Sequence, residues 1–228
     1  MKLAVFFPGI GYHCDKPLLY YSGKIAGQYQ YEEIRVSYTG LKRLRADAFE
    51  EILEETLQEA LVQTEKCLEA VDWNRYEDIL FVSKSIGTAV AAAYARRHGI
   101  HCRNIYYTPL VQTFDYDPQP GIVFHGTGDP WADTDRIKER CREHELPFHI
   151  VGNGNHSLEV KDDTERNLSI LTDVMKRTED YIADTIQYRQ LDAEEICCEL
   201  FGQFIRHQKV TKCRRREAGE WVIREDPF

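Results

Sequence analysis

The stretch Phe81-Val82-Ser83-Lys84-Ser85-Ile86-Gly87-Thr88 carries the strongest indication of how this chain folds. Residues 79–82 are a short apolar run, which predicts a buried strand. Residues 89–97 are rich in alanine and predict a helix. A tight turn between them carries the hydroxyl group of Ser85, which faces the positive end of the helix. A serine on such a turn has the geometry of a nucleophile elbow, although it is also often only a helix N-cap.

The rest of the chain alternates short apolar runs with long amphipathic ones. Because the short runs are continuous and rich in Val, Ile, Phe and Tyr, they predict strands buried on both faces of a parallel sheet. This alternation favours an α/β fold with three layers, α/β/α, around a mostly parallel central sheet. The predicted strands cover residues 3–7, 33–38, 79–82, 104–107, 122–125 and 148–151, and the predicted helices 46–71, 88–97, 133–144 and 164–187.

The C-terminal stretch departs from this alternation. Residues 192–206 predict a short amphipathic helix, and residues 209–216 and 221–224 predict two strands of a hairpin. We therefore expect an α/β domain over residues 1–190 and a helix-hairpin extension over 191–228, packed on or beside the core. Its basic cluster favours a solvated hairpin face. A docking surface for an acidic protein partner, or a homodimer contact, is the alternative.

Charge and composition narrow the classes of partner. The 228 residues carry a net charge of −9, which argues against nucleic acid or an anionic membrane as the main partner. No apolar stretch approaches the roughly 20 residues of a membrane span. The N-terminal apolar run is too short for a signal peptide. Seven cysteines in no regular framework predict free thiols, so we expect a cytoplasmic location.

Two further residues complete a candidate set with Ser85. Asp129 follows the predicted strand at 122–125, and His156 lies in a glycine-rich loop after the strand at 148–151. A serine hydroxyl becomes a good nucleophile when a histidine takes its proton, and a carboxylate orients that histidine. All three candidates follow strands at their carboxyl ends, where open α/β sheets place their sites.

Each candidate has an alternative. Asp129 precedes a proline and could be only a turn residue. Asp133 and Asp135 lie nearby, but we expect them to begin the next helix. His125 is expected to be a packed histidine beside the site, and His13 to be either a substrate contact or a solvated loop residue.

Four blocks of sequence, taken in this order, resemble the α/β-hydrolase superfamily, and most of all its small capless members of the esterase or dienelactone-hydrolase type. They are residues 7–12 (FPGIGY), 83–87 (SKSIG), 125–130 (HGTGDP) and 154–158 (GNHSL). They are similar to the family's oxyanion loop, G-x-S-x-G elbow, acid block and histidine block. The resemblance covers residues 1–187. It departs from the family at Ser83, where the elbow has glycine, and in length, because two edge strands are missing and no room remains for a lid.

The resemblance implies acyl transfer on a small ester or thioester, with no metal or organic cofactor. Ser85 would attack the carbonyl carbon, His156 would move the proton and Asp129 would orient His156. The backbone N–H groups of Ile86, and of Ile10 or Gly11, would bind the oxyanion. Alternatives are a hydrolase-fold binding protein without catalytic activity and a peptidase of the same fold.

Other motifs are weaker. Residues 5–11 begin like a dinucleotide fingerprint, but Cys14 holds the position of the third glycine. The spacing of Cys197, Cys198, His207 and Cys213 fits no standard zinc pattern, so buried thiols are favoured. Aromatic residues near the expected site loops could shape an apolar pocket or cap the core; they are Tyr20, Tyr21, Tyr106, Tyr107, Phe114, Tyr116 and Trp131.

Overall fold

The computed structural model describes residues 1–42, 49–183, 213–215 and 221–223. The chain divides into two compact units, Met1–Ala183 and Asp184–Phe228. The first unit contains the whole central sheet and the candidate residues Ser85, Asp129 and His156.

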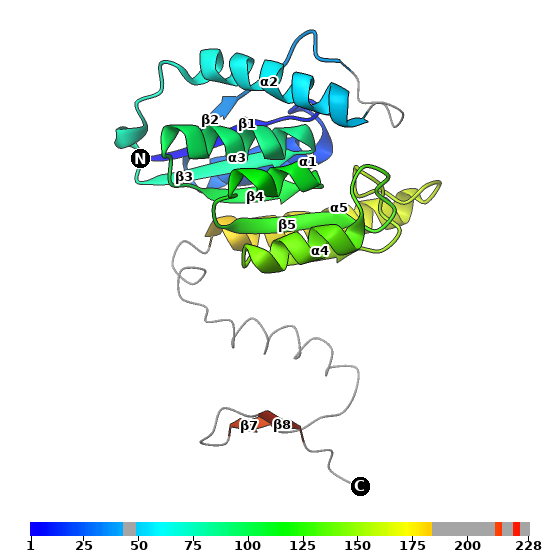
Figure 1. The fold of residues 1–228 in the computed structure, drawn as a ribbon. Coiled ribbons are helices and arrows are strands. Elements are labelled where there is room, and N and C mark those ends of the chain that lie inside the picture. The colour runs from blue at the N-terminus through cyan, green and yellow to red at the C-terminus, as the bar shows by residue number, and fades with distance from the viewer. Residues whose placement is uncertain (43–48, 184–212, 216–220, 224–228) are drawn as a thin grey trace, which may run out of the picture. The chain divides into compact units, whose positions relative to one another are not determined.

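The central sheet has six strands, all parallel, in the order β2-β1-β3-β4-β5-β6 (Figure 1). The predicted α/β architecture is therefore confirmed. The second strand begins and ends a few residues earlier than its sequence predicts, although the Val36 N–H still donates to the Phe6 carbonyl of β1 (2.9 Å). The strands are β1 Lys2–Phe7, β2 Tyr31–Arg35, β3 Asp78–Lys84, β4 Arg103–Tyr107, β5 Gly121–Gly126 and β6 Phe148–Val151.

Helices pack on both faces of this sheet. They are α1 Pro17–Gln28, α2 Phe49–Leu68, α3 Ile86–His98, α4 Thr134–Glu143 and α5 Thr164–Ala183, with short 3₁₀ helices at Trp73–Arg75 and Val111–Tyr116. Helix α1 was not predicted from the sequence. Its start is marked by Pro17 in the first turn, a position that proline favours because its missing N–H has no helical partner there.

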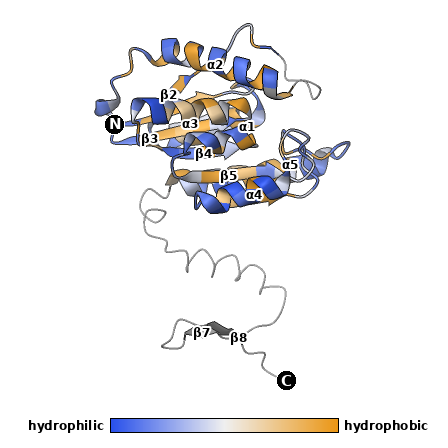
Figure 2. Ribbon diagram, in the orientation of Figure 1, coloured by the Kyte–Doolittle hydropathy of each residue, from blue (hydrophilic) through white to orange (hydrophobic). Residues whose placement is uncertain are grey.

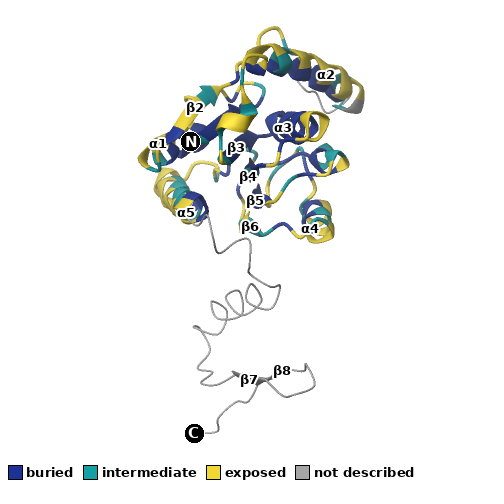
Figure 3. Ribbon diagram, turned by 90° about the vertical axis from the view of Figure 1, so that its left-hand side faces the viewer, coloured by how far each residue is buried: buried dark blue, intermediate teal, exposed yellow. Residues whose placement is uncertain are grey.

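Alternation along each strand divides the core between the two faces. Leu3, Val5 and Phe7 of β1 pack with α2 and α3, whereas Ala4 and Phe6 pack with α1 and α5. Helix α4 joins α2 and α3 on the first face, as the end-on view shows (Figure 3). Strands β3 and β5 are hydrophobic over much of their length (Figure 2). This packing fixes the sheet rigidly and leaves its carboxyl edge to the loops.

In the second unit, β7 (Cys213–Arg215) and β8 (Trp221–Ile223) pair antiparallel. The helix predicted at 192–206 lies outside the described residues, as do Cys197, Cys198 and His207, so the helix-hairpin extension and its boundary near residue 190 stay predictions. The four cysteines whose side chains are described are free thiols; they are Cys14, Cys67, Cys102 and Cys141. None of the described helices combines the length and the apolar character needed to cross a membrane.

A largely buried ion pair ties β3 to β4 at the amino edge of the sheet. The guanidinium of Arg103 lies 3.1 Å from the Asp78 carboxylate, and each side chain is 15% exposed. Arg103 also donates hydrogen bonds to the Tyr31 hydroxyl (2.6 Å) and to the Tyr181 carbonyl (2.8 Å). The network joins β2, β3, β4 and α5 on the edge opposite the candidate site.

Replacing Arg103 with Met is expected to lower the free energy of unfolding by about 3 kcal/mol, because it leaves the Asp78 carboxylate buried without its cation. Urea denaturation measures this change. The double variant R103M/D78N is the control and should lose less stability than R103M alone. Equal losses in the two would contradict a charge-pairing role.

Candidate active site

The carboxyl edge of the sheet brings together the three residues that the sequence singled out. Nε2 of His156 lies 2.7 Å from Oγ of Ser85, and Nδ1 of His156 lies 2.7 Å from Oδ2 of Asp129. Ser85 directly follows β3, Asp129 follows β5 and His156 follows β6. Because the strands are parallel, these three loops meet at one edge.

Ser85 has a backbone conformation that an L-residue rarely adopts. Its φ of 57° and ψ of −127° turn the chain sharply from β3 into α3. Ser85 occupies the N-cap position of α3, but its side chain makes no capping hydrogen bond to the helix, so capping does not account for the hydroxyl group. Its N–H donates to the Tyr107 carbonyl (3.0 Å), and Ser83, which stands where the family has glycine, donates its hydroxyl to the Ile105 carbonyl (3.2 Å). Both contacts fasten the turn to β4.

The histidine and the acid are withdrawn from solvent. The side chain of Asp129 is fully buried and that of His156 is 17% exposed. The second carboxylate oxygen of Asp129 accepts the Trp131 N–H (2.9 Å). Burial lowers the pKa of His156 below its ordinary 6.5, although the hydrogen bond to Asp129 opposes the shift. In the tautomer with the proton on Nδ1, neutral His156 can accept the proton of Ser85.

Thr108, which directly follows β4, fixes the loop that carries His156, called the histidine loop. Nothing in the sequence indicated this role for Thr108. Thr108 donates its hydroxyl to the His156 carbonyl (3.0 Å) and its N–H to the Phe124 carbonyl (2.7 Å). Its φ of 43° is rare for a β-branched residue. Such strain is concentrated at functional sites, but no local sequence pattern marks it.

The loop of residues 8–12, called the oxyanion loop below, packs directly on the elbow at residues 83–87. A turn closes it, since Gly9 and Tyr12 exchange backbone hydrogen bonds of 3.1 and 3.2 Å. A methyl group at Gly87 would overlap the carbonyl oxygens of Phe7 and Pro8, so only glycine permits this approach.

The amide groups predicted for an oxyanion hole lie at this contact. Ile10 and Gly11 occupy the corner of the turn, where Gly11 has a φ of 72°. Among the described residues no acceptor takes the N–H of Ile10 or Gly11. Ile86 is the first residue of α3, so its N–H has no partner within the helix. Within the described part of the chain, three amide donors are therefore free in the elbow and in the loop that packs on it.

The residues considered as alternatives to His156 and Asp129 make contacts outside the site. His125 is fully buried and its Nε2 bonds the Thr134 hydroxyl (3.0 Å), as expected of a packed histidine. Asp133 caps α4 by accepting the N–H groups of residues 135 and 136. The side chain of His13 is 62% exposed and its Nδ1 accepts the N–H of Asp15. None of these residues contacts Ser85.

The aromatic residues divide between core and surface. Tyr106, Tyr107 and Phe114 are core residues. Trp131 stacks on Phe49 with ring centroids 5.7 Å apart. Tyr20 and Tyr21 lie exposed on α1, and Tyr116 packs at the margin of the core. Tyr106, Tyr107 and Phe114 therefore pack in the core, which is one of the two roles predicted for these aromatic residues.

No role was predicted for Lys84, the residue before Ser85. Only 3% of it is exposed, and its Nζ lies 4.8 Å from the centroid of the Tyr12 ring. Burial lowers the pKa of Lys84 to about 7, although the Asp129 charge opposes the shift. A lysine at the last position of an otherwise apolar strand is unusual, and that feature could have identified it.

Comparison with known proteins gives matches in structure but not in sequence. No protein-family model matches the chain, and no curated protein matches it. Est1E from Butyrivibrio proteoclasticus is similar, with 11% identity and a TM-score of 0.58 over 80% of this chain and 87% of that one. An alpha-beta serine hydrolase homologue from Coxiella burnetii has 14% identity and a TM-score of 0.54 over 78% and 84%.

A third similar structure is described as one without a lid. XC6422 from Xanthomonas campestris, described as a serine hydrolase without lid, has 13% identity and a TM-score of 0.50 over 78% of this chain and 80% of that one. The described part of the chain therefore has the α/β-hydrolase fold, as its sequence blocks indicated. At these identities the likeness establishes the fold, and the chemistry must be argued from the site.

The loop that carries Asp129, called the acid loop, and the histidine loop are held together by a second close contact between backbone segments. A methyl group at Gly126, the last residue of β5, would overlap the carbonyl oxygen of Gly154 and lie 2.6 Å from its carbon. Gly126→Ala is expected to lower the free energy of unfolding by about 1–3 kcal/mol, because the loops must separate. Chemical denaturation measures it. Gly152→Ala is the matched control: a Cβ there meets nothing within 4 Å, and stability should not fall.

Proposed function

We propose that the protein is a serine hydrolase that cleaves a small acyl ester or thioester through Ser85, His156 and Asp129. The observation that carries this proposal is the continuous chain of contacts from Ser85 through His156 to a fully buried Asp129. A hydroxyl, an imidazole and a carboxylate in this order form the arrangement that activates serine for acyl transfer.

The proposed reaction has two halves. Ser85 Oγ attacks the carbonyl carbon while His156 Nε2 takes its proton, and His156 then delivers that proton to the leaving group. Water attacks the resulting acyl-serine in the same way and releases the acid. Asp129 holds the ring of His156 and stabilises the imidazolium that forms. No cofactor or metal is needed for these steps.

The oxyanion of each tetrahedral intermediate would be bound by the Ile86 N–H and by that of Ile10 or Gly11. Donors of this kind are typically worth about 3 kcal/mol each to the transition state. The close packing of the oxyanion loop on the elbow supports the assignment, because donors must be fixed before the charge develops.

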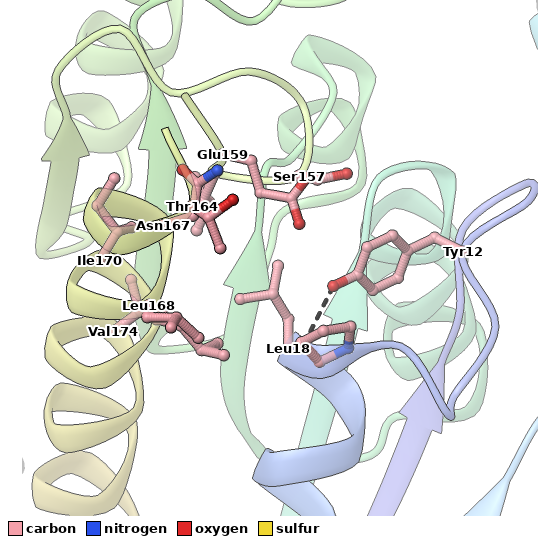
Figure 4. Close-up of a pocket in the computed structure, with 12 residues that line it drawn as sticks. Tyr12, Leu18, Ser157, Glu159, Thr164, Asn167, Leu168, Ile170 and Val174 are labelled. Atoms are coloured by element: carbon pink, nitrogen blue, oxygen red, sulfur yellow. Dashed lines mark hydrogen bonds between the residues drawn. The ribbon is translucent and has the colours of Figure 1, made fainter. Parts of the chain in front are cut away.

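A cavity lined by Tyr12 and by Ser157, the residue after His156, supports a small apolar group in the substrate (Figure 4). It measures about 330 Å³ and lies between α1, α5 and the histidine loop. This volume is near the lower end of the roughly 300–1,000 Å³ of ligand pockets. Tyr12 of the oxyanion loop and Ser157, which follows His156, form one wall, and Leu171 and Val174 form another. The exposed Glu159 carboxylate at its margin favours an uncharged group over an anion.

The alternative of an inactive binding protein is not favoured by the site. A module that had lost catalysis would have no need to keep Ser85 Oγ 2.7 Å from His156 Nε2, or to bury Asp129 behind it. The substitution of Ser83 for the elbow glycine does not disturb the turn, because its hydroxyl bonds within the sheet.

Labelling with a fluorophosphonate probe tests the proposal. We expect the wild type to be labelled at Ser85 and the Ser85→Ala variant not to be labelled. His156→Gln should lower the rate of p-nitrophenyl acetate hydrolysis by about 10⁶-fold, because it removes the base.

The matched controls are Ser169→Ala and His101→Gln, which change exposed residues outside the site and should leave labelling and hydrolysis unchanged. A wild type that resists the probe, or a Ser85→Ala variant labelled as fast as wild type, would contradict the proposal.

Narrowing the cavity tests whether it binds the apolar part of the ester. Leu171→Trp is expected to raise KM for a hexanoyl ester by about 10-fold, since losing one or two methylenes of contact costs about 1–2 kcal/mol. KM for the acetyl ester should change little. Val62→Trp on the exposed face of α2 is the control. Equal effects on both esters would place the acyl group elsewhere.

A further inference from the structure

A buried lysine lies against the proposed nucleophile, and the proposed reaction does not use it. Among the described residues, Lys84 forms no ion pair, and its one specific side-chain contact is the face of the Tyr12 ring. Burying an ammonium group without a paired anion is costly. Its stem also packs on the oxyanion loop: a Cβ at Gly9 would lie 3.2 Å from Lys84 Cδ and 3.0 Å from Ser85 Cβ.

Other contacts also fix Tyr12 in place. Because Tyr12 belongs to the oxyanion loop, a shift of Tyr12 would move the loop with it. Its hydroxyl accepts the N–H of Leu18 (3.1 Å), and its backbone closes the turn with Gly9. Burial raises the pKa of Tyr12 to about 12, with a small contribution from Glu159. The phenol is therefore neutral near pH 7, and its ring face attracts a cation.

We propose that Lys84 is a positioning residue: its ammonium group, held on the Tyr12 ring, keeps the oxyanion loop against the elbow, and loss of its proton releases that contact. The inference rests on the proposed function, because it concerns the loop that would bind the oxyanion. It adds a requirement that a serine, a histidine and an aspartate alone do not impose.

Several titratable groups surround Lys84. Asp129, from the loop after β5, favours its protonated form, and Lys84 in turn lowers the pKa of His156. From β4, Tyr107 is its register partner, and burial raises the pKa of that phenol well above its ordinary value. Tyr12 is neutral as well. Within this group, burial lowers the pKa of both Lys84 and His156, and the two phenols stay neutral.

The sign of the pH dependence follows from these two groups. The base must be neutral, so activity rises as the pH increases through the lowered pKa of His156. The positioning contact needs a charged Lys84, so activity falls as the pH increases through about 7. A bell-shaped profile results. If Lys84 played no part, the activity would instead reach a plateau at alkaline pH.

The experiment measures the rate of fluorophosphonate labelling of Ser85, and kcat/KM for p-nitrophenyl acetate, on both sides of pH 7. Lys84→Arg keeps a permanent charge that stacks well on an aromatic ring, so its alkaline limb should disappear. Lys84→Met keeps the apolar stem without the charge. Its rate should be about 10- to 100-fold lower near neutral pH, since misplaced groups cost this much. Its acid limb should move to higher pH, because His156 loses a repelling charge.

Lys2→Met is the matched control. Lys2 also lies over a tyrosine ring, that of Tyr31 at 5.3 Å, but it begins β1 at the far edge of the sheet. Its pH profile should equal that of the wild type. A double-mutant cycle with Tyr12→Leu gives a second route should a single variant fold poorly. The combined loss in K84M/Y12L should be smaller than the product of the two single losses, because both remove one contact.

The outcomes separate the two proposals. A wild type that is not labelled overturns the proposed function and this inference with it. A wild type that is labelled, but whose alkaline limb is absent or survives unchanged in Lys84→Arg and Lys84→Met, overturns the role of Lys84 alone. The role of Lys84 would also be overturned if the loss of rate in K84M/Y12L equalled the product of the losses in the two single variants.

Discussion

The close approach of backbone segments at the carboxyl edge of the sheet is the constraint on which the site depends. The carbonyl groups of Phe7 and Pro8 lie where a side chain at Gly87 would be, and the carbonyl of Gly154 lies where one at Gly126 would be. Each glycine lets one loop rest directly on another. Main-chain packing thereby fixes the oxyanion loop to the elbow, and the loop that carries His156 to the end of β5. Such packing is stiffer than contact through long side chains.

This constraint explains how strained residues persist. Ser85, Thr108 and Leu158 all have positive φ, and each lies in or beside the segments that carry the candidate residues. Conformations of this kind cost of order 1–3 kcal/mol each and survive only where the surroundings over-determine them. The buried sheet and the hydrogen bonds from Ser85 and Thr108 to neighbouring strands supply that support. The same rigidity keeps the charges of Asp129, His156 and Lys84 in a poorly solvated space, where their mutual effects are strong.

Much of the fold follows from local sequence, because the short runs rich in Val, Ile, Phe and Tyr indicate strands. The inner strands β1, β3, β4 and β5 are buried as this pattern predicts, whereas the edge strands β2 and β6 are more exposed. Ser85, Asp129 and His156 could be chosen because each follows a strand, and parallel strands end at one edge. Helix α1 was missed, since its pattern is weak and only Pro17 marks its start. Thr108 and the contact between Lys84 and Tyr12 could not be predicted. They depend on how loops from distant parts of the sequence pack, which no local pattern encodes.

We propose that Ser85 and the free amides of Ile86 and of Ile10 or Gly11 form one acyl-transfer site. A crystal structure of the protein after reaction with a small phosphonate ester tests this proposal. We expect phosphorus bonded to Ser85 Oγ, with one phosphonyl oxygen within about 2.7–3.1 Å of the Ile86 N–H and of the N–H of Ile10 or Gly11. An adduct on another residue, or a phosphonyl oxygen turned toward solvent and away from these amides, would contradict it.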